Sequence, residues 1–320
     1  MPVTQEVFIE AHPERRASIF MSIQPSVRWL LNLPLLRHLR PLARTVLAVA
    51  EPVGSLTVKR LPHIIHRVKK ETITIVSANL WHDWPKHRNF TERLESFTGM
   101  LIAENVDVVL LQEVSHRPDF HVDQWLSEQL GMSSAYSRAN GHAAAIGFEE
   151  GLAVLSRYPI QSLYLQQLGS SGNLFVHRLA MGAKVLSPSG PFAAISVHLG
   201  LFKRQNSLQL AHLYTWLNSI MGGLPTVVGG DFNTHENSTQ MTRMRSTWLD
   251  TFRTLHPHAD ATTHELRSPW GNVIRRSRLD YIFLRPGKAH WKVIETRHLD
   301  GTYGPHSDHR AVLTRISLVG

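Results

Sequence analysis

The stretch VVGGDFNTH, residues 227–235, joins an apolar strand pattern to a polar pair. Val227 and Val228 are β-branched residues in a short apolar run, which is typical of a strand buried on both faces. The two glycines that follow allow close backbone approach and a turn. Asp231 and Asn233 are two residues apart, so their side chains point to one side of an extended chain. The stretch fits a functional site and, equally well, a solvated Asp-x-Asn turn.

Polar residues recur at or just after the ends of other apolar strand patterns, and they favour the site. These residues are Asn79, Glu113, His198 and Asp280, while Asp308 and His309 stand at the start of the last predicted strand. Carboxylates and amides in a chain without cysteine suit a hard, oxygen-preferring cation, Mg²⁺ or Mn²⁺. Histidines beside carboxylates suit proton transfer or a phosphate contact. Together they match the needs of phosphoryl chemistry, because its transition state is chiefly a problem of charge.

The composition sets the broad class of the protein. The chain has 320 residues, 42% of them hydrophobic and 18% charged, which fits a globular fold of one large domain or two small ones. The absence of cysteine excludes disulfides and thiolate metal sites. The first residues lack the pattern of a signal peptide, and no apolar run is long enough for a spanning helix. We therefore expect a cytoplasmic monomer.

The basic charge lies mostly in the N-terminal segment. Residues 1–70 hold eleven Lys or Arg and four Asp or Glu, a net charge of +7 of the total +9. Helices are predicted over 26–33 and 41–50, and residues 51–70 read as a connector. Leu42, Val46 and Val49 would share one face of the second helix. This arm either contacts a membrane surface or a partner, or packs on the main domain with its arginines in solvent.

The rest of the chain, residues 71–320, reads as one catalytic domain in which strands outnumber helices. Strands are predicted over 71–80, 106–114, 151–160, 179–186, 191–199, 224–231, 278–284 and 307–318, and helices over 87–104, 123–131 and 207–220. Most of these strands are apolar on both faces. The pattern predicts two sheets packed on each other with helices outside.

Seven motifs in this domain are specific as an ordered set. They are SANLW (77–81), LLQEV (110–114), GLAVLSRYPI (151–160), SVHLG (196–200), GGDFNT (229–234), RLDYIFL (278–284) and SDHRAV (307–312). The set resembles the endonuclease/exonuclease/phosphatase superfamily over residues 72–318. The resemblance implies an α/β (α+β) fold, a four-layered sandwich of two packed mixed β-sheets flanked by helices, here with an N-terminal helical arm. It also implies divalent-metal-dependent cleavage of phosphoester bonds, as in deoxyribonucleases, abasic-site endonucleases, sphingomyelinases and inositol-polyphosphate phosphatases.

The resemblance assigns roles to individual residues. Asn79, Glu113 and Asp308 match the metal ligands, and Asp231 and Asn233 match the pair that positions the attacking water and a phosphate oxygen. His309 matches the catalytic histidine, Asp280 the carboxylate that orients it, and His198 a second histidine. In pancreatic-type deoxyribonucleases a glutamate pairs with that second histidine and an arginine contacts phosphate. Glu150 and Arg178 match these two, although the adjacent Glu149 leaves the register of the glutamate open.

The segment before RLDYIFL departs from the abasic-site endonucleases. Those enzymes place a Trp close before this motif to line the pocket for the missing base. Here the nearby residues are Arg275, Arg276, Ser277 and Arg278, and Trp270 is further away. An abasic-site specialisation is therefore not expected. The arginine cluster would contact a nucleic-acid backbone or a lipid headgroup, or form a solvated loop.

These observations predict a Mg²⁺-dependent phosphodiesterase of endonuclease type acting on nucleic acid. The first alternative keeps the chemistry and changes the substrate to a phospholipid. It would be a sphingomyelinase-like or phosphoinositide-cleaving enzyme held on a membrane by residues 1–70, and the near-neutral charge of residues 71–320 favours it. The second alternative is an inactive member that binds a partner. It predicts the loss of a key site residue, and Glu113, Asp231, Asp280 and His309 are all present.

Overall fold

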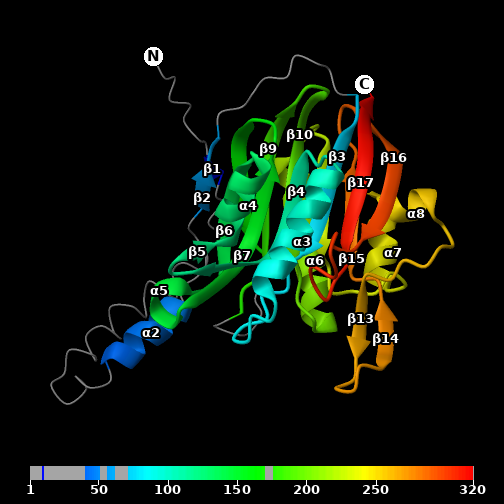
Figure 1. Ribbon diagram of the computed structural model, residues 1–320. Coiled ribbons are helices and arrows are strands. Elements are labelled where there is room, and N and C mark those ends of the chain that lie inside the picture. The colour runs from blue at the N-terminus through cyan, green and yellow to red at the C-terminus, as the bar shows by residue number, and fades with distance from the viewer. Residues whose placement is uncertain (1–8, 11–39, 51–55, 62–70, 170–175, 320) are drawn as a thin grey trace, which may run out of the picture.

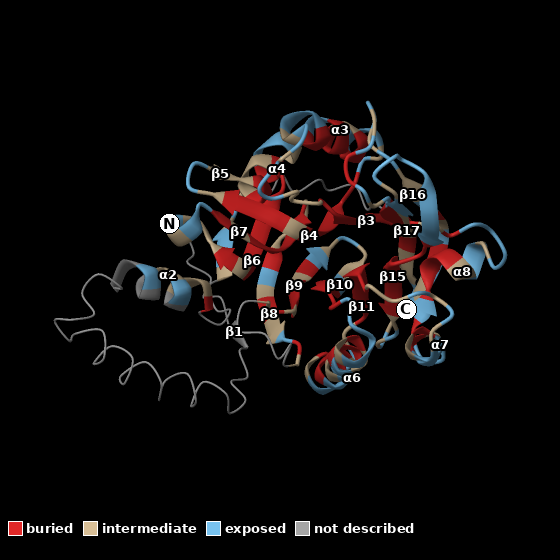
Figure 2. Cartoon of the chain, turned by 90° about the horizontal axis from the view of Figure 1, so that it is seen from below, coloured by how far each residue is buried: buried red, intermediate tan, exposed pale blue. Residues whose placement is uncertain are grey.

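The computed structural model describes residues 9–10, 40–50, 56–61, 71–169 and 176–319. Two large β-sheets pack face to face, and helices cover their outer faces (Figures 1 and 2). The predicted four-layered sandwich of two mixed sheets is confirmed. Among the described helices, none combines the length and the apolar character needed to cross a bilayer.

The first sheet has the strand order β1-β8-β9-β10-β11-β15-β12. Its strands are β1 (Ile9–Glu10), β8 (Ile160–Gln167), β9 (Leu179–Ser187), β10 (Gly190–His198), β11 (Thr226–Asp231), β12 (Leu249–Asp250) and β15 (Asp280–Arg285). Strands β10 and β11 are parallel, whereas β11 and β15 are antiparallel. The last residues of β10 and β11 and the first residue of β15 therefore share one edge. There His198 is opposite Asp231, and Asp231 is opposite Asp280.

The second sheet has the order β16-β17-β3-β4-β7-β6-β2, with β5 paired to β4. Its strands are β2 (Leu56–Lys59), β3 (Ile73–Asn79), β4 (Val108–Arg117), β5 (Phe120–His121), β6 (Ser133–His142), β7 (Phe148–Ser156), β16 (His290–Leu299) and β17 (Ala311–Val319). The parallel pair β3 and β4 lies at its centre. Asn79 therefore ends a buried strand at the same end of the sandwich as Asp231.

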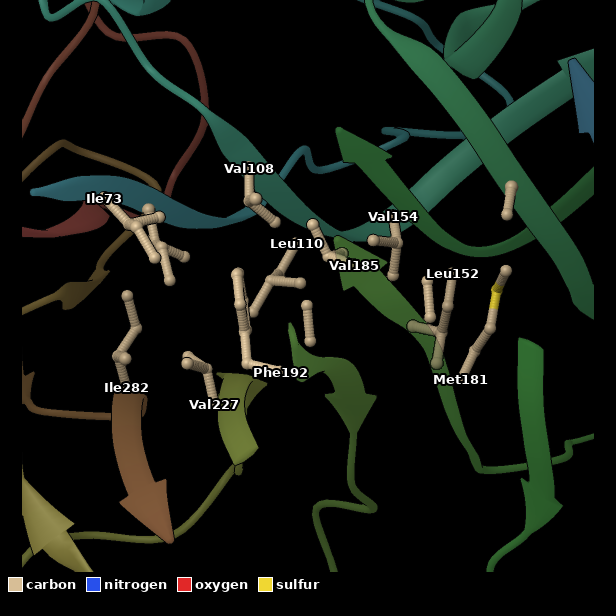
Figure 3. Packing of buried hydrophobic residues seen from close by; sticks show 14 of the residues in the cluster. Ile73, Val108, Leu110, Leu152, Val154, Met181, Val185, Phe192, Val227 and Ile282 are labelled. Carbon is tan, nitrogen blue, oxygen red and sulfur yellow. The ribbon is translucent and has the colours of Figure 1, made fainter. Parts of the chain in front are cut away.

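The space between the sheets is filled by aliphatic side chains. Leu110 and Val154 of the second sheet face Val185, Phe192 and Val227 of the first (Figure 3), and all five are fully buried. Burying one such side chain contributes about 1.5–3 kcal/mol. This core, and not any single polar pair, holds the two strand edges of the site in register.

The glycines of the GGD sequence are required by close approach. A Cβ on Gly229 would lie 2.8 Å from Leu110 Cδ1 in the facing sheet. A Cβ on Gly230 would lie 2.0 Å from the carbonyl oxygen of Val197 in the neighbouring strand. Side chains at these positions would separate the sheets or break the pairing of β10 with β11. The glycines therefore let Asp231 sit deep at the strand edge.

The helices complete the outer layers. They are α3 (Phe90–Ala103), α4 (Val122–Leu130), α5 (Ala143–Ile146), α6 (Lys203–Ile220), α7 (Thr239–Arg245) and α8 (Thr251–Leu255). Helices α3 and α4 bury apolar side chains against the second sheet, and α6 and α7 do so against the first. The helix predicted over 207–220 is confirmed as α6, which buries Leu210, Leu213 and Leu217 on one face.

The described parts of the N-terminal segment pack on the sandwich. Helix α2 (Arg40–Ala50) lies beside β6, where Arg138 Nη1 donates to the carbonyl of Ala48 at 3.3 Å. Strand β2 pairs with β6, so the predicted connector contains an edge strand. That strand is only four residues long, which explains why its pattern was missed. The predicted helix over 26–33 lies outside the described residues, and the boundary at residue 70 stays a prediction.

Candidate active site

The predicted site residues gather at one end of the sandwich, the lower end in Figure 1. His198 and Asp231 end adjacent strands of the first sheet, and Asn79 ends a strand of the second. Asp280 begins β15 instead of following a strand, and the antiparallel pairing brings it opposite Asp231. Asp308 and His309 precede β17, which starts at Ala311 and not at residue 307 as predicted.

Glu113 lies inside β4 and not at its end. The register of β4 shifts between Leu111 and Val114, and Glu113 has a left-handed backbone with φ of 53°. Non-glycine residues rarely adopt this conformation, and it is often found at functional sites. Glu113 Oε1 accepts a hydrogen bond from Asn79 Nδ2 at 3.1 Å, and Oε2 accepts one from the backbone N–H of His82 at 3.2 Å. The bulge therefore brings the carboxylate of Glu113 to the edge that carries the site, where a regular strand would not place it.

Asn79 joins the two sheets at the site. Its Nδ2 donates to Glu113 and, at 3.2 Å, to Asp231 Oδ2, while its Oδ1 accepts from the backbone N–H of Trp81 at 2.9 Å. In this arrangement Asn79 bridges two carboxylates. Its predicted role as a direct metal ligand stays a prediction.

His309 and Asp280 form a close pair, in which Asp280 is buried and the His309 side chain is mostly enclosed. His309 Nδ1 lies 2.8 Å from Asp280 Oδ2, and Nε2 lies 4.0 Å from Asp231 Oδ2. Burial opposes the charge of the ring, but the carboxylates of Asp280, Asp231 and Asp308 outweigh it and raise the pKa of His309 to about 10. Asp280 Oδ1 is buried without a hydrogen-bond partner among the described residues. His309 is therefore a cation held in place by Asp280, and Asp280 Oδ1 still has the capacity to accept a hydrogen bond.

Asp231 is at the centre of the site. Its Oδ1 accepts the backbone N–H of Asn233 at 2.8 Å, and Asn233 Nδ2 lies 3.2 Å from its Oδ2. Burial and the nearby charge of Asp280 raise the pKa of Asp231 to about 7, against the opposing charge of His309. A carboxylate of this kind holds a proton more readily than a solvated one does.

His198 faces Asp231 from the neighbouring strand. Arg178 Nη1 lies 3.1 Å from His198 Nδ1, and His198 Nε2 lies 3.7 Å from Asp231 Oδ2. Burial, followed by the charges of Arg178 and His309, lowers the pKa of His198 well below its usual value. Because an arginine only donates, Nδ1 is the acceptor and the neutral ring carries its proton on Nε2. The two histidines of the site therefore differ in charge.

The structure distinguishes Glu150 from Glu149. Glu150 is buried, accepts a hydrogen bond from Asn140 Nδ2, and has a pKa raised by burial and by the charge of Glu113. Glu149 instead accepts the backbone N–H of Ala143 at 3.2 Å, away from Glu113. Of the two glutamates, Glu150 therefore lies on the face of β7 that is turned toward the site. The partner of His198 at Nδ1 is Arg178, whose charge also acts on Glu150.

The arginine cluster before RLDYIFL divides into two environments. Arg275 and Arg276 are exposed, whereas Arg278 is only 2% exposed and forms a two-point ion pair with Asp250 at 2.7 and 2.8 Å. Arg278 also lies 4.4 Å from the ring centroid of Tyr281. Its Nη1 and Nη2 are held by Asp250 inside the fold, so Arg278 itself is neither an exposed ligand contact nor part of a solvated loop, the alternatives that the sequence left open for the cluster.

Two residues near the site were missed by the sequence analysis, Asn140 and His264. The ring centroid of His264 lies 4.6 Å from that of His309, and the two residues form an isolated backbone bridge. Asn140 also accepts the backbone N–H of His177 at 2.6 Å. Neither stands at the end of an apolar strand pattern. Only the tertiary structure brings them to the site.

Among the residues that the structure describes, two overlapping groups of side chains have the spacing needed to hold a cation. The ligand atoms of Asp231, Asp280 and His309 lie within 4.8 Å of one another, as do those of His264, Asp308 and His309. Of the predicted metal set, Asn79 and Glu113 are hydrogen-bonded, and the charge of Glu113 helps burial to raise the pKa of Asp308. The charge of Glu113 is felt at Asp308, and two carboxylates this close fit a divalent cation.

The comparison with known families decides the identity of the fold. The family model of the Endonuclease/Exonuclease/phosphatase family matches residues 76–309. The chain belongs to this family. Members of the endonuclease/exonuclease/phosphatase family hydrolyse phosphoester bonds, and the match includes every predicted site residue from Asn79 to His309.

Individual proteins are similar to this chain in sequence or in fold. The chain is 32% identical over 142 residues to the uncharacterized protein YbhP of Escherichia coli K12, a match that covers 40% of this chain and 54% of YbhP. It thus spans about half the length of that relative. The structure of the human Nocturnin catalytic domain with bound sulfate anion has a TM-score of 0.63 at 20% identity, covering 83% of this chain and 97% of that one. A family protein from Leptotrichia buccalis has a TM-score of 0.63 at 19% identity, covering 77% and 99%.

Proposed function

We propose that this chain is a Mg²⁺-dependent phosphoesterase that hydrolyses phosphodiester bonds, most readily those of a nucleic acid in an endonuclease-type reaction. The observation that carries the proposal is the arrangement of His309, Asp280 and Asp231. It sets a charged histidine and a buried carboxylate of raised pKa side by side at a strand edge. Such a site can activate water and stabilise negative charge at the same time.

The metal would be held by Glu113 and Asp308 with Asn79 beside them, and Mn²⁺ is an alternative to Mg²⁺. When bound, the cation would supply positive charge to the phosphate oxygens. The five carboxylates of the region support this part of the proposal. They are Glu113, Glu150, Asp231, Asp280 and Asp308, and burial raises the pKa of three of them, Glu150, Asp231 and Asp308.

The protein's own groups account for the proton transfers. Asp231 Oδ2 lies between the Nε2 atoms of His198 and His309, at 3.7 and 4.0 Å. A water bound among these three atoms would be oriented by Asp231 and would lose its proton to that carboxylate. Asn233 fixes Asp231 by donating from its backbone N–H to Oδ1 and from Nδ2 to Oδ2, and Oδ2, which also accepts from Asn79, is the oxygen nearest the two histidines.

The histidines and Arg178 would stabilise the charge that develops on the phosphate. His309 remains protonated over the physiological range because its pKa is raised to about 10. His198 remains neutral and offers its Nε2 proton. Arg178 holds His198 in that state through the contact with Nδ1. One positive and one neutral donor on either side of Asp231 suit a phosphodiester, which carries a single negative charge.

A metal and substrate test decides the proposal. EDTA should abolish hydrolysis of bis(p-nitrophenyl) phosphate, and Mg²⁺ or Mn²⁺ should restore it. A panel of plasmid DNA, abasic DNA, RNA, sphingomyelin and phosphoinositides would then define the substrate, and we expect plasmid DNA to be cleaved and abasic DNA not to be preferred. Full activity after exhaustive chelation would remove the metal from the mechanism.

A phospholipid substrate is the second candidate, and exposed apolar side chains of α2 favour it. Leu42 is 64% and Val46 43% exposed, on a helix within the basic residues 1–70. Replacing both by Ser should weaken binding to anionic vesicles and leave hydrolysis of a small soluble phosphodiester unchanged. If vesicle binding is unchanged, α2 has a structural role and does not contact the membrane.

A further inference from the structure

The β13–β14 ribbon, formed by β13 (His264–Arg267) and β14 (Val273–Ser277), belongs to neither large sheet. It projects from the end of the molecule that carries the active site (Figure 1). Every residue from Leu266 to Arg276 is exposed except the half-buried Ser268. A two-stranded ribbon with no buried face contributes little to the stability of the fold.

The ribbon carries an unusual amount of exposed apolar surface. Trp270 at its tip is 85% exposed, Ile274 65% and Leu266 49%. Single exposed apolar residues are normal on protein surfaces, but several on one projecting element indicate a binding surface.

Other strongly exposed apolar residues belong to the loops that carry active-site residues. Among the described large hydrophobic residues, the four most exposed are Trp270, Tyr303, Phe202 and Leu201, each above 70%. Leu201 and Phe202 closely follow His198, and Tyr303 precedes Asp308 by five residues. The most exposed apolar side chains therefore belong to the segments that position the site.

Basic side chains accompany this apolar surface. The ribbon contains Arg267, Arg275 and Arg276 against a single carboxylate, Glu265, a net charge of +2. Glu265 accepts hydrogen bonds from Arg267 and Arg276, while Arg275 donates to Ser277 Oγ at 3.0 Å. Apolar side chains at a tip with arginines behind them suit the boundary between acyl chains and anionic headgroups.

The base of the ribbon is attached to the catalytic pair. Thr263 Oγ1 accepts the backbone N–H groups of Leu279 and Asp280 at 2.9 and 3.2 Å. The carbonyl of Thr263 accepts the N–H of Arg310 at 2.7 Å, next to His309. A surface bound by the ribbon would therefore be held in a fixed position relative to the active site.

We propose that the β13–β14 ribbon docks on the surface of an anionic phospholipid bilayer, which would bring the phosphodiester of a lipid headgroup, the second candidate substrate above, to the active site. The substrate part rests on the proposed phosphoesterase function, whereas the docking part does not. A nucleic acid fits the ribbon less well. Trp270 could stack on a base, but Leu266 and Ile274 gain nothing on a sugar–phosphate backbone.

The docking is tested by co-sedimentation of the full-length protein with vesicles of phosphatidylcholine and phosphatidylglycerol. Ile274→Ser should lower vesicle affinity about tenfold, because an apolar side chain no longer leaves water. Ile102→Ser is the matched control, since Ile102 is 61% exposed in the last turn of α3, and it should have no effect. Arg275→Gln with Arg276→Gln should lower affinity at low salt roughly fivefold per charge.

Tryptophan quenching by brominated lipids locates the contact. Wild-type fluorescence should be quenched by brominated vesicles, and Trp270→Phe should lose most of that quenching while retaining binding. Equal binding by wild type and the Ile274 and arginine variants would overturn the proposal, as would a loss of DNA binding with unchanged vesicle binding. Hydrolysis of bis(p-nitrophenyl) phosphate by the same samples reports on the phosphoesterase function separately, because vesicle binding needs no turnover.

Discussion

Two histidines with mostly enclosed side chains, His309 and His116, each lie beside two carboxylates. His309 Nδ1 lies 2.8 Å from Asp280, and His116 Nε2 lies 2.6 Å from Asp123. A second carboxylate faces the other ring nitrogen in both cases, Asp231 at 4.0 Å and Glu149 at 3.4 Å. Each ring has a raised pKa, because the carboxylates outweigh the cost of burial. Pair geometry and pKa direction alone therefore do not separate catalytic from structural residues.

The surroundings of the two pairs differ. The His116 ring lies between the rings of His121 and Tyr136, with centroids 4.1 and 3.7 Å away, and Glu149 also accepts from Tyr136. The His309 pair retains an unpartnered oxygen on Asp280 and lies at the edge where strands of both sheets end. A buried polar group with capacity left over is the better candidate for chemistry, because a saturated network has nothing to offer a substrate.

The largest expected effect is that of His309→Ala. It should lower kcat about 10³–10⁴-fold, since the ring would stabilise charge in the transition state, and it should also lower Tm, because Asp280 stays buried without its partner. His116→Leu is the matched control and should retain most of the activity. Steady-state kinetics on a soluble phosphodiester beside thermal melts measure both. A similar loss of kcat in the two variants would remove the distinction drawn here.

The next effect is that of Asp280→Asn, which should lower kcat about 10²-fold. The amide would no longer favour the charged ring or hold its orientation. In combination with His309→Ala it should be little worse than His309→Ala alone, because residues that act as one unit are not additive. A double-mutant cycle measures this. Additive losses would mean that the two residues act independently.

A smaller effect, on stability, is expected for the other pair. His116→Leu should lower the free energy of unfolding by about 3 kcal/mol, because Asp123 stays buried without its main partner. Urea denaturation at pH 6 measures the loss. His87→Leu, at a half-buried ring, serves as the reference and should cost less. An unchanged midpoint for His116→Leu would show that its network is not structural.

The smallest effect is the pH dependence of that loss. The pKa of His116 is raised in the folded state, so its charged interactions contribute fully below the unfolded pKa of about 6.5. The contribution is lost as the pH rises through the folded value. The stability difference between wild type and His116→Leu should therefore be largest near pH 6 and narrow at higher pH. A difference that widens with pH would contradict the charged state of His116.

Much of the site could be predicted because it lies at the ends of strands. Apolar runs mark buried strands, and polar residues at their ends, such as Asn79, His198 and Asp231, are visible in one dimension. Glu113 was found as well, although it lies in a bulge inside β4. The predicted catalytic and metal-binding roles of these residues stay predictions.

Other features were not predictable from local pattern. Arg278 belongs to an arginine-rich segment, and only the position of Asp250 on a neighbouring strand shows that it is buried. The choice of Glu150 over Glu149 depends on how β6 pairs with β7, where the register shifts between Arg138 and Asn140. A one-residue shift reverses the face of every side chain, and no local sequence signal reveals it.

The sequence by itself determined the family, the two-sheet sandwich and the set of strand-end residues. The ordered motifs carry the family resemblance, and the sheets and strand ends follow because hydrophobic alternation and strand-end polarity are local properties of the chain. Only the tertiary structure decided which of these residues meet. The antiparallel pairing of β15 with β11 sets Asp280 opposite Asp231, and the segment before β17 brings in His309. It also left the β13–β14 ribbon without a covering layer, because exposure depends on what packs against a segment and not on the segment's own residues.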